Sequence, residues 1–426
     1  QAAKFSLLVL YPSFLLLAVA HGARRFVVSR RSCEPDVSVP RPGLTQLLAL
    51  LALSLLVLNL TYRFDEFGKP LGTFEFKSQF LSGDASADPY EANTGNRFRG
   101  TLLSALPVPL PGQYVLGFDA QKHDEECGFM WLRGGRLVHR GAWYNPMQTL
   151  LFKLPLGTLI LVFACAGYWV CASRSFGAAA ATPFVSALFL IGMLCTQTGL
   201  NWPVRYSLPA IPLLIVACGG AIRAFWKSVP GRALVVACLL WNVAALLGSR
   251  PYYFSYANEL AGGSGAGRQY FMGSNYDWGQ DLFRLKPWCE ASPDRQPVAV
   301  CYYGELSPES LQVRTMGLPE SFLSVQEEDP PPTAAQEQKP FYWAVSWNFL
   351  AGLSMDVTLA NGLRDRAMVD PTRLSPDLAC ARIGYTMFVF HILPDHAPFA
   401  RGSLTYGQLR SCLRRVTGRE RSYNTP

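Results

Sequence analysis

Two carboxylates stand at one-turn spacing in the polar segment that begins at Asn275 and reads Asn-Tyr-Asp-Trp-Gly-Gln-Asp-Leu. On a helix, Asp277 and Asp281 would share a face, and such a pair could hold a divalent ion. Capping of a following helix by Asp277 and an ion pair of Asp281 with Arg284 explain the same residues without a metal, and this is the arrangement we expect. We expect Trp278 to bury its ring where two domains meet.

Two basic side chains lie in or beside apolar runs, where an anionic group would be a natural partner. Arg205 precedes the run 208–224, with Tyr206 as a hydrogen-bonding neighbour. We expect this pair to meet a phosphate, although anchoring to an interfacial carboxylate is an equal alternative. Lys153 lies inside the run 147–170, and a base in that position either extends its head group to the interface or serves a site.

A third polar group, Asp119, Lys122 and Asp124, falls in a long polar stretch and could line a cleft for a polar substrate. A solvated cluster of surface charges is the competing interpretation. Asp65 and Glu66 are expected to form a solvated or salt-bridged start of the same stretch. The glycine-rich segment 262–267 lacks the Gly-Lys-Ser/Thr ending of a phosphate loop, so we interpret it as a sharp turn.

Composition places the chain among membrane proteins. Its 426 residues are 50% hydrophobic and 16% charged, and the apolar residues gather in blocks. A spanning helix needs roughly 20 mostly apolar residues, and several windows approach that length. They are residues 5–20, 44–60, 147–170, 183–200, 208–224 and 233–247.

Arginine and lysine gather in alternate short loops, which indicates the orientation. The loops around Arg24 to Arg41, at Arg174, and from Arg223 to Arg232 are predicted to be cytoplasmic. The long loop 61–146 and everything after Ser249 are then extracytoplasmic. The formal charge of +8 partly reflects this retention pattern, so we do not interpret it as a nucleic-acid footprint.

The first window has two interpretations, a signal peptide ending near Ala20 or a membrane segment of a chain that has lost an upstream portion, and we favour the second. Of the eleven cysteines, several lie in apolar windows, where cysteine packs as a small apolar residue. The spacing of the others makes a zinc site improbable. One disulfide, Cys289 to Cys301, is conceivable.

After residue 250 the pattern changes to short strands and helices. Runs rich in valine and aromatic residues predict buried strands at 297–303, 341–347 and 385–392, preceded by a helix at 278–289. The proline-rich segment 326–339 reads as an exposed loop. We therefore predict a membrane domain at 1–250, with about six transmembrane helices, and an extracytoplasmic α/β domain at 251–426.

Taken in order, nine short segments resemble a bacterial subgroup of the family 39 glycosyltransferases, related to protein O-mannosyltransferases and to the aminoarabinose transferase of lipid A. The resemblance covers nearly the whole chain and corresponds to the C-terminal two-thirds of that family. The sequence departs from the family pattern at Trp202-Pro203 and at 144–146. The matching segments are 4–6, 68–72, 107–111, 116–122, 153–157, 205–210, 258–263, 275–282 and 384–385.

The resemblance implies a polytopic, GT-C type enzyme of the plasma or inner membrane. Its reaction would move a sugar, with inversion, from a polyprenyl-phosphate carrier to an extracytoplasmic protein, lipid or glycan. Such transfer needs a carboxylate base and cationic groups that hold the departing phosphate. The family's base lies in a loop that no residue here matches, so the catalytic residue stays unknown.

Arg205, Tyr206 and Lys153 are then the candidates for the donor phosphate, and Asp119, Lys122 and Asp124 for the acceptor cleft. Asn275, Asp277, Trp278 and Asp281 form an interdomain motif. No cofactor is implied, and a divalent metal is not expected. The alternative functions are a noncatalytic membrane scaffold and a transporter-like protein, although no internal repeat of the transporter kind is evident.

Overall fold

The computed structural model describes residues 44–83, 94–128, 130–139, 141–171, 178–197, 199, 203–323, 339–398 and 400–415. The chain divides into two compact units. Unit 1 comprises Gln1–Phe129, Arg140–Gln148 and Leu161–Val235, and unit 2 comprises Met130–His139, Thr149–Ile160 and Val236–Pro426. The two units are defined by contacts within the structure, whereas the predicted division at residue 250 separates apolar from polar sequence. The units do not test where the chain leaves a bilayer, so the division at residue 250 stays a prediction.

Long apolar helices make up much of unit 1. Leucine and alanine are strong helix formers and carry no polar group that competes with the backbone, so these runs wind into helices. The Trp169 indole donates to the carbonyl of Ala217 over 3.3 Å, which joins two of the helices. The helices are α2 (Leu44–Thr61), α6 (Leu156–Cys171), α7 (Ala178–Cys195) and α9 (Ala210–Phe225).

One helix in the described part of the chain, α10 (Val229–Gly248), is long and apolar enough to cross a membrane. Four shorter apolar helices occupy Leu48–Thr61, Leu156–Cys171, Thr182–Cys195 and Ala210–Phe225. The window 147–170 was expected to be continuous, but it divides into α5 (Asn145–Lys153) and α6. Pro155 causes this break, since it lacks the N–H that a continuous helix needs. The window 5–20 lies outside the described residues.

The polar part of unit 1 consists of short elements and bridges. Isolated bridges pair Pro70 with Pro107 and Phe76 with Gly95. The Phe74 and Phe76 rings are buried and stacked 5.7 Å apart, which gives this region a small core. Its helical segments are η2 (Leu71–Thr73), α3 (Gln79–Ser82), η3 (Leu102–Ala105), α4 (Gly112–Cys127) and, after α7, α8 (Val204–Ser207).

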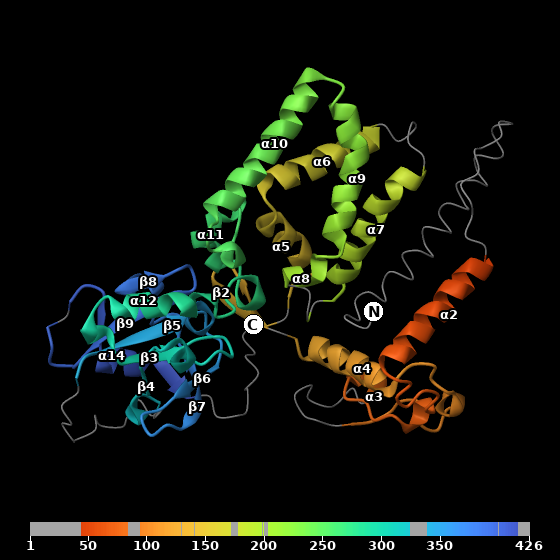
Figure 1. Cartoon of the computed structure of the whole chain (residues 1–426). Helices are drawn as coiled ribbons and strands as arrows, with labels where there is room; N and C mark the ends of the chain where they lie inside the picture. Colours follow the sequence, from red (N-terminus) through yellow and green to blue (C-terminus); the bar gives the residue numbers. More distant parts are fainter. Residues whose placement is uncertain are drawn as a thin grey trace. The chain divides into compact units, whose positions relative to one another are not determined.

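A mixed sheet forms the centre of unit 2. Its strand order is β10-β9-β5-β3-β4, with β8 added to β9, and β5 runs parallel to β3 and antiparallel to β9. Figure 1 shows these central strands side by side with α12 (Leu285–Glu290) lying across them. The strands are β3 (Val298–Cys301), β4 (Thr315–Met316), β5 (Phe341–Ser346), β8 (Ala381–Ile383), β9 (Met387–Leu393) and β10 (Ser403–Thr405).

Alternation along the central strands builds a core on both faces of the sheet. Trp343 of β5 and Phe390 of β9 pack into the larger cluster, whereas Ala344 and Val389 face the smaller one with Leu285 of α12. Successive side chains of a strand point to opposite faces, so a sheet covered on both sides needs this nearly continuous apolar sequence. The predicted strands at 297–303, 341–347 and 385–392 are found as β3, β5 and β9.

Smaller elements complete unit 2. They are a hairpin of β1 (Met130–Arg133) and β2 (Arg136–His139), and a three-stranded sheet of β11 (Leu413–Arg415), β7 (Arg364–Val369) and β6 (Met355–Thr358). The short helical segments are η4 (Tyr253–Ser255), η5 (Glu259–Ala261), α11 (Gly263–Ala266), η6 (Gly267–Gln269), η7 (Gly273–Asn275), η8 (Gln280–Arg284), η9 (Pro293–Arg295), η10 (Pro308–Leu311), η11 (Glu320–Phe322), α13 (Trp347–Leu350), η12 (Pro376–Leu378) and α14 (Tyr406–Cys412).

Two further expectations meet the structure here. Cys289 and Cys301 are free thiols, so the conceivable disulfide does not form. The reason is geometric, because Cys289 belongs to the core cluster on one face of the sheet and Cys301 to the cluster on the other. The predicted loop 326–339 lies outside the described residues except for Lys339.

Candidate functional site

The break between α5 and α6 is held by Asn258, more than a hundred residues along the chain. Its side-chain amide donates to the carbonyls of Leu151, over 2.6 Å, and Leu154, over 2.8 Å. In a continuous helix the Leu151 carbonyl would accept from residue 155, but Pro155 has no N–H, and the Leu154 carbonyl would accept from Thr158, whose N–H bonds to Asn242 instead. The Asn258 oxygen accepts from the backbone of Leu260 at 3.0 Å. One buried side chain thus caps two helical segments at once.

Lys153 closes the same junction from the other side. Its ammonium donates to the carbonyls of Phe254 at 3.2 Å and Tyr256 at 2.6 Å, and lies 4.9 Å from the centre of the Phe271 ring. The sequence left two roles open for Lys153, a head group extended to the interface or service in a site. In the structure its ammonium bonds to backbone carbonyls of the protein itself. It ties α5 to the segment that leads into η5.

Asp277 is fully buried and bonded to a distant turn. Its carboxylate accepts from the backbone of Gly279 at 3.2 Å and of Asn348 at 3.2 Å, and the Asn348 amide donates to the Asp277 carbonyl at 3.0 Å. Burial raises the pKa of Asp277 to about 6, since taking a charge out of water disfavours the ionised form. The expectation that Asp277 caps the next helix is wrong: η8 begins at Gln280 with no side-chain cap.

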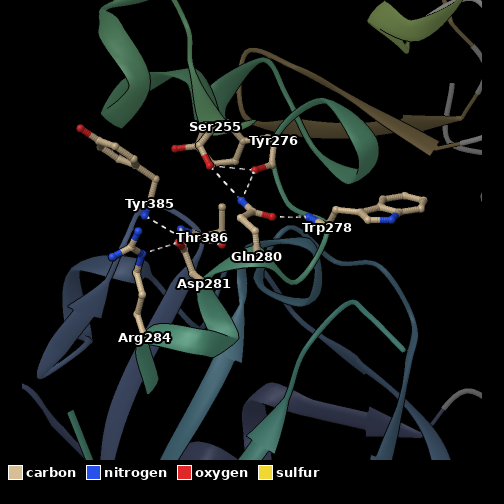
Figure 2. Close-up of polar contacts among 8 residues, drawn as sticks. All are labelled: Ser255, Tyr276, Trp278, Gln280, Asp281, Arg284, Tyr385 and Thr386. Carbon is tan, nitrogen blue, oxygen red and sulfur yellow. Dashed lines mark hydrogen bonds and ion pairs between the residues drawn. The ribbon is translucent and has the colours of Figure 1, made fainter. Parts of the chain in front are cut away.

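Asp281 bonds to the turn that leads into β9. Its Oδ2 accepts from the backbone of Tyr385 and Thr386, each at 3.0 Å, and from the Thr386 hydroxyl at 2.9 Å. The expected ion pair with Arg284 is present at 3.6 Å. Gly384 adopts a φ of 62°, and a Cβ there would overlap the Asp281 carboxylate. Figure 2 shows Asp281 reaching these partners.

Ser255 and Gln280 form a further set of hydrogen bonds, around the carbonyl of Tyr276. The Ser255 hydroxyl donates to the Tyr276 carbonyl at 3.0 Å, and the Gln280 amide donates to that carbonyl at 2.9 Å and to Ser255 Oγ at 3.0 Å (Figure 2). Gln280 also accepts from the backbone of Trp278 at 2.8 Å. The Trp278 ring is 49% exposed and stands edge-on to Tyr303. Its predicted burial between domains stays a prediction.

The residues of 275–282 therefore act mainly as internal bonding partners. Asn275 is buried as well. Since Asp277 and Asp281 reach different turns, they do not converge on a common point, and the described residues contain no group of three or more potential metal ligands. Ser255, Gln280, Asn348 and Thr386 were not predicted as site residues from the sequence. Only Gln280 lies within the segment that drew attention, and short polar residues in turns carry little signal of their own.

Arg205 and Tyr206 lie together on α8, the single turn before α9. The guanidinium of Arg205 is exposed, lies 5.2 Å from the centre of the Tyr206 ring, and approaches its hydroxyl at 3.4 Å. Stacking on an aromatic ring keeps a guanidinium in an extended position. The predicted pairing of these two side chains is therefore present. An anion would meet a donor fork and a phenol at this position.

The predicted cluster on α4 separates into different roles. Asp119 is buried and accepts from the backbone of Lys77 at 2.7 Å and from the backbone and hydroxyl of Ser78 at 3.0 and 2.6 Å. Lys122 pairs with Glu125 at 2.8 Å, and Asp124 is exposed. Asp119 fixes the start of α3, so an acceptor cleft could use at most the exposed members of this group.

Glu66 was expected in a solvated or salt-bridged loop, and it pairs with Lys69 at 2.7 Å.

No family model, no curated protein and no solved structure matches this chain.

Proposed function

We propose that this chain belongs to a membrane glycosyltransferase that takes a sugar from a polyprenyl-phosphate carrier and transfers it to an extracytoplasmic acceptor. The observation that carries the proposal is that four of the resembling segments bond in two pairs. The Asn258 amide donates to the carbonyl of Leu154, and Asp281 accepts from the backbone of Tyr385 and lies against Gly384.

Chance matches of short motifs have no reason to converge, because segments a hundred residues apart bond only if the fold needs both. The convergence supports the resemblance as a feature of one architecture. Gly157 adds a further point, since any Cβ there would overlap the Cys238 carbonyl of α10. The glycine of the segment 153–157 is thus required where α6 and α10 approach each other.

In this proposal Arg205 meets the carrier phosphate, with Tyr206 beside it. The phosphate gains charge as the sugar leaves, and a guanidinium already stacked in place lowers the energy of that transition state. Lys153 becomes a weaker candidate, because two backbone carbonyls occupy its ammonium.

A noncatalytic scaffold is the second candidate, and one observation favours it. The two carboxylates of the segment 275–282 are both buried and bonded to backbone N–H groups. Neither is placed to accept the proton of an acceptor hydroxyl. A scaffold would bind the carrier lipid and leave its sugar in place, whereas an enzyme would bind the carrier and transfer the sugar.

Binding of farnesyl phosphate, a short carrier analogue, tests the proposal in the purified chain. Arg205→Gln should weaken binding roughly ten- to a hundredfold, the range for losing charge-assisted hydrogen bonds. Arg223→Gln is the matched control, since it removes the same charge from an exposed arginine in the last turn of α9. Farnesol should bind far more weakly than farnesyl phosphate. Equal affinities of both variants and the parent would contradict the proposal.

A further inference from the structure

A row of arginine and aromatic side chains runs over one part of unit 2. The Arg284 guanidinium lies 4.4 Å from the centre of the Tyr252 ring, and Tyr252 stands edge-on to Tyr385 at 5.1 Å. The Arg382 guanidinium lies 5.0 Å from the centre of the Tyr385 ring. Figure 2 shows Arg284 and Tyr385 on the same side of Asp281. Each guanidinium therefore has an aromatic neighbour that fixes its plane.

Arg268 extends this row. Its guanidinium and that of Arg382 lie 5.9 and 5.7 Å from the centre of the buried Phe388 ring. Both charges also act on the phenol of Tyr276, where they lower its pKa against the larger opposing effect of burial. We call Arg268, Arg284 and Arg382, with Tyr252 and Tyr385, the arginine row.

The arginine row has more positive charge than its carboxylates balance. Arg382 is exposed and has no carboxylate within 4.0 Å among the residues that the structure describes. Arg268 approaches Asp377 only at 3.9 Å, and that carboxylate is 87% exposed. Arg284 approaches Asp281 at 3.6 Å, although Asp281 already accepts bonds from Tyr385 and Thr386. Guanidinium groups with unused N–H donors favour a phosphate.

The glycine-rich turn 262–267 lies against this row. A Cβ added to Gly265 would be 4.0 Å from both Arg382 Nη2 and Tyr385 Cε1, and the Tyr276 hydroxyl donates to the Ser264 carbonyl at 2.6 Å. Small residues here keep the turn low beside the two side chains. A larger residue at Gly265 would reach toward the Arg382 guanidinium, which is exposed.

The arginine row also adjoins the end of the longest apolar helix. Tyr252 follows α10, which ends at Gly248, by four residues, and the Trp241 indole of α10 donates to Glu259 at 3.1 Å. Around this helix end, large apolar side chains remain exposed: Tyr253 at 51%, Phe254 at 43%, Leu260 at 54% and Phe283 at 62%. Aromatic residues beside a long apolar helix and arginines just beyond it are the arrangement found at a membrane interface.

We propose that the arginine row is a binding site for the phosphate group of an anionic lipid. The guanidinium groups hold the phosphate, and the exposed side chains at the end of α10 contact the acyl region. This proposal uses other residues than the one for Arg205, and it holds whether or not the chain transfers a sugar. The continuity with α10 favours a lipid over a free anion, because the phosphate of a bilayer lipid lies just beyond the apolar core that such a helix would cross.

Binding of dioctanoyl phosphatidic acid to the full chain in an uncharged detergent tests this site. The parent should bind it saturably, and dioctanoylglycerol, which lacks the phosphate, should not compete. Arg382→Gln and Arg268→Gln should each weaken binding roughly tenfold. Arg382→Lys, which keeps the charge but loses the planar fork, should fall between the parent and Arg382→Gln.

Arg366→Gln is the control, because this exposed arginine lies on β7 in the separate three-stranded sheet and bonds to Ser354. It should bind the lipid as the parent does. Parent-like affinity of Arg382→Gln and Arg268→Gln would overturn the site. Inorganic phosphate competing as strongly as the lipid would overturn the lipid assignment and leave a site for a soluble anion. Thermal unfolding of each variant verifies that it remains folded.

Discussion

At the scale of single residues, burial controls the behaviour of Asp277. Its pKa is raised to about 6 because it is taken out of water, so the native chain binds a proton more tightly than the unfolded chain does. The contribution of Asp277 to the free energy of unfolding should therefore fall as pH rises from about 4 to about 6, by on the order of 3 kcal/mol.

Asp277→Asn removes this titration while keeping the shape of the side chain. We expect the stability of the variant to depend less on pH between about 4 and 6 than that of the parent. Thermal unfolding across this range, followed for both proteins, measures the difference. Parallel curves would show that Asp277 does not titrate as a buried carboxyl.

Gly384 offers a second test at this scale, because its φ of 62° and its closeness to Asp281 both exclude a side chain. Gly384→Ala should destabilise unit 2 by about 2 kcal/mol or more. Gly362→Ala is the matched control: its φ is 81°, and nothing lies within 4 Å of an added Cβ. It should cost only the backbone strain. Equal losses would indicate that Asp281 is not held against the turn.

The roles of these residues could be predicted only in part. The ion pair of Asp281 with Arg284 follows from their spacing of three, since such neighbours meet on a helix. The bonds of Asp277 to Asn348 and of Asp281 to Thr386 depend on tertiary contacts 71 and 105 residues apart. A sequence pattern read over one or two turns carries no information about partners at such separations.

At the scale of elements, Pro155 and Asn258 together divide the window 147–170 into two helices. Asn258→Ala should leave the carbonyls of Leu151 and Leu154 without their donor, which costs about 1 to 3 kcal/mol for each buried group. Asn361→Ala is the control, because Asn361 is exposed and accepts only from the backbone of Leu363. Denaturation of the two variants should differ by several kilocalories per mole. Equal stabilities would contradict the capping role of Asn258.

Element types were predictable where the composition was uniform. The runs 44–60, 208–224 and 233–247 are helical because leucine and alanine leave the backbone no competing partner. Valine and aromatic residues likewise predicted β3, β5 and β9. The capping role given to Asp277 failed because Gly279, with a φ of 79°, turns the chain before η8 begins. The direction that the chain takes after a glycine with positive φ cannot be inferred from the neighbouring residues.

At the scale of the whole molecule, the distribution of arginine and lysine between loops predicts a membrane topology. Basic loops at Arg174 and from Arg223 to Arg232 should be cytoplasmic, and the chain after Ser249 should be extracytoplasmic. A bacterial phosphatase fused to the C-terminus should be active, and a green fluorescent protein fused there should be dark. If the fluorescent protein fusion is bright and the phosphatase fusion is inactive, the C-terminus is cytoplasmic, and an extracytoplasmic acceptor site is excluded.

Apolar surface is what the sequence predicted best at this scale, and the location of chemistry is what it predicted least. Four of the resembling segments, 153–157, 258–263, 275–282 and 384–385, carry bonds within unit 2, because buried polar residues must be satisfied and are therefore distinctive. Accessible donors such as Arg205 and Arg382 lie on short or edge elements, where one arginine in a sequence looks like any other. Contacts with aromatic rings, Tyr206 for Arg205 and Tyr385 for Arg382, distinguish them from solvated arginines.

Photochemical labelling can locate the carrier phosphate on the chain. A polyprenyl phosphate carrying a photoreactive group next to its phosphate is bound to the full chain, irradiated, and the labelled peptides are identified by mass spectrometry. We expect labelling of the peptide that contains Arg205 and Tyr206, suppressed by unlabelled farnesyl phosphate and absent with the photoreactive alcohol. Equal labelling by the alcohol, or labelling that spares this peptide, would contradict a carrier-phosphate site on α8.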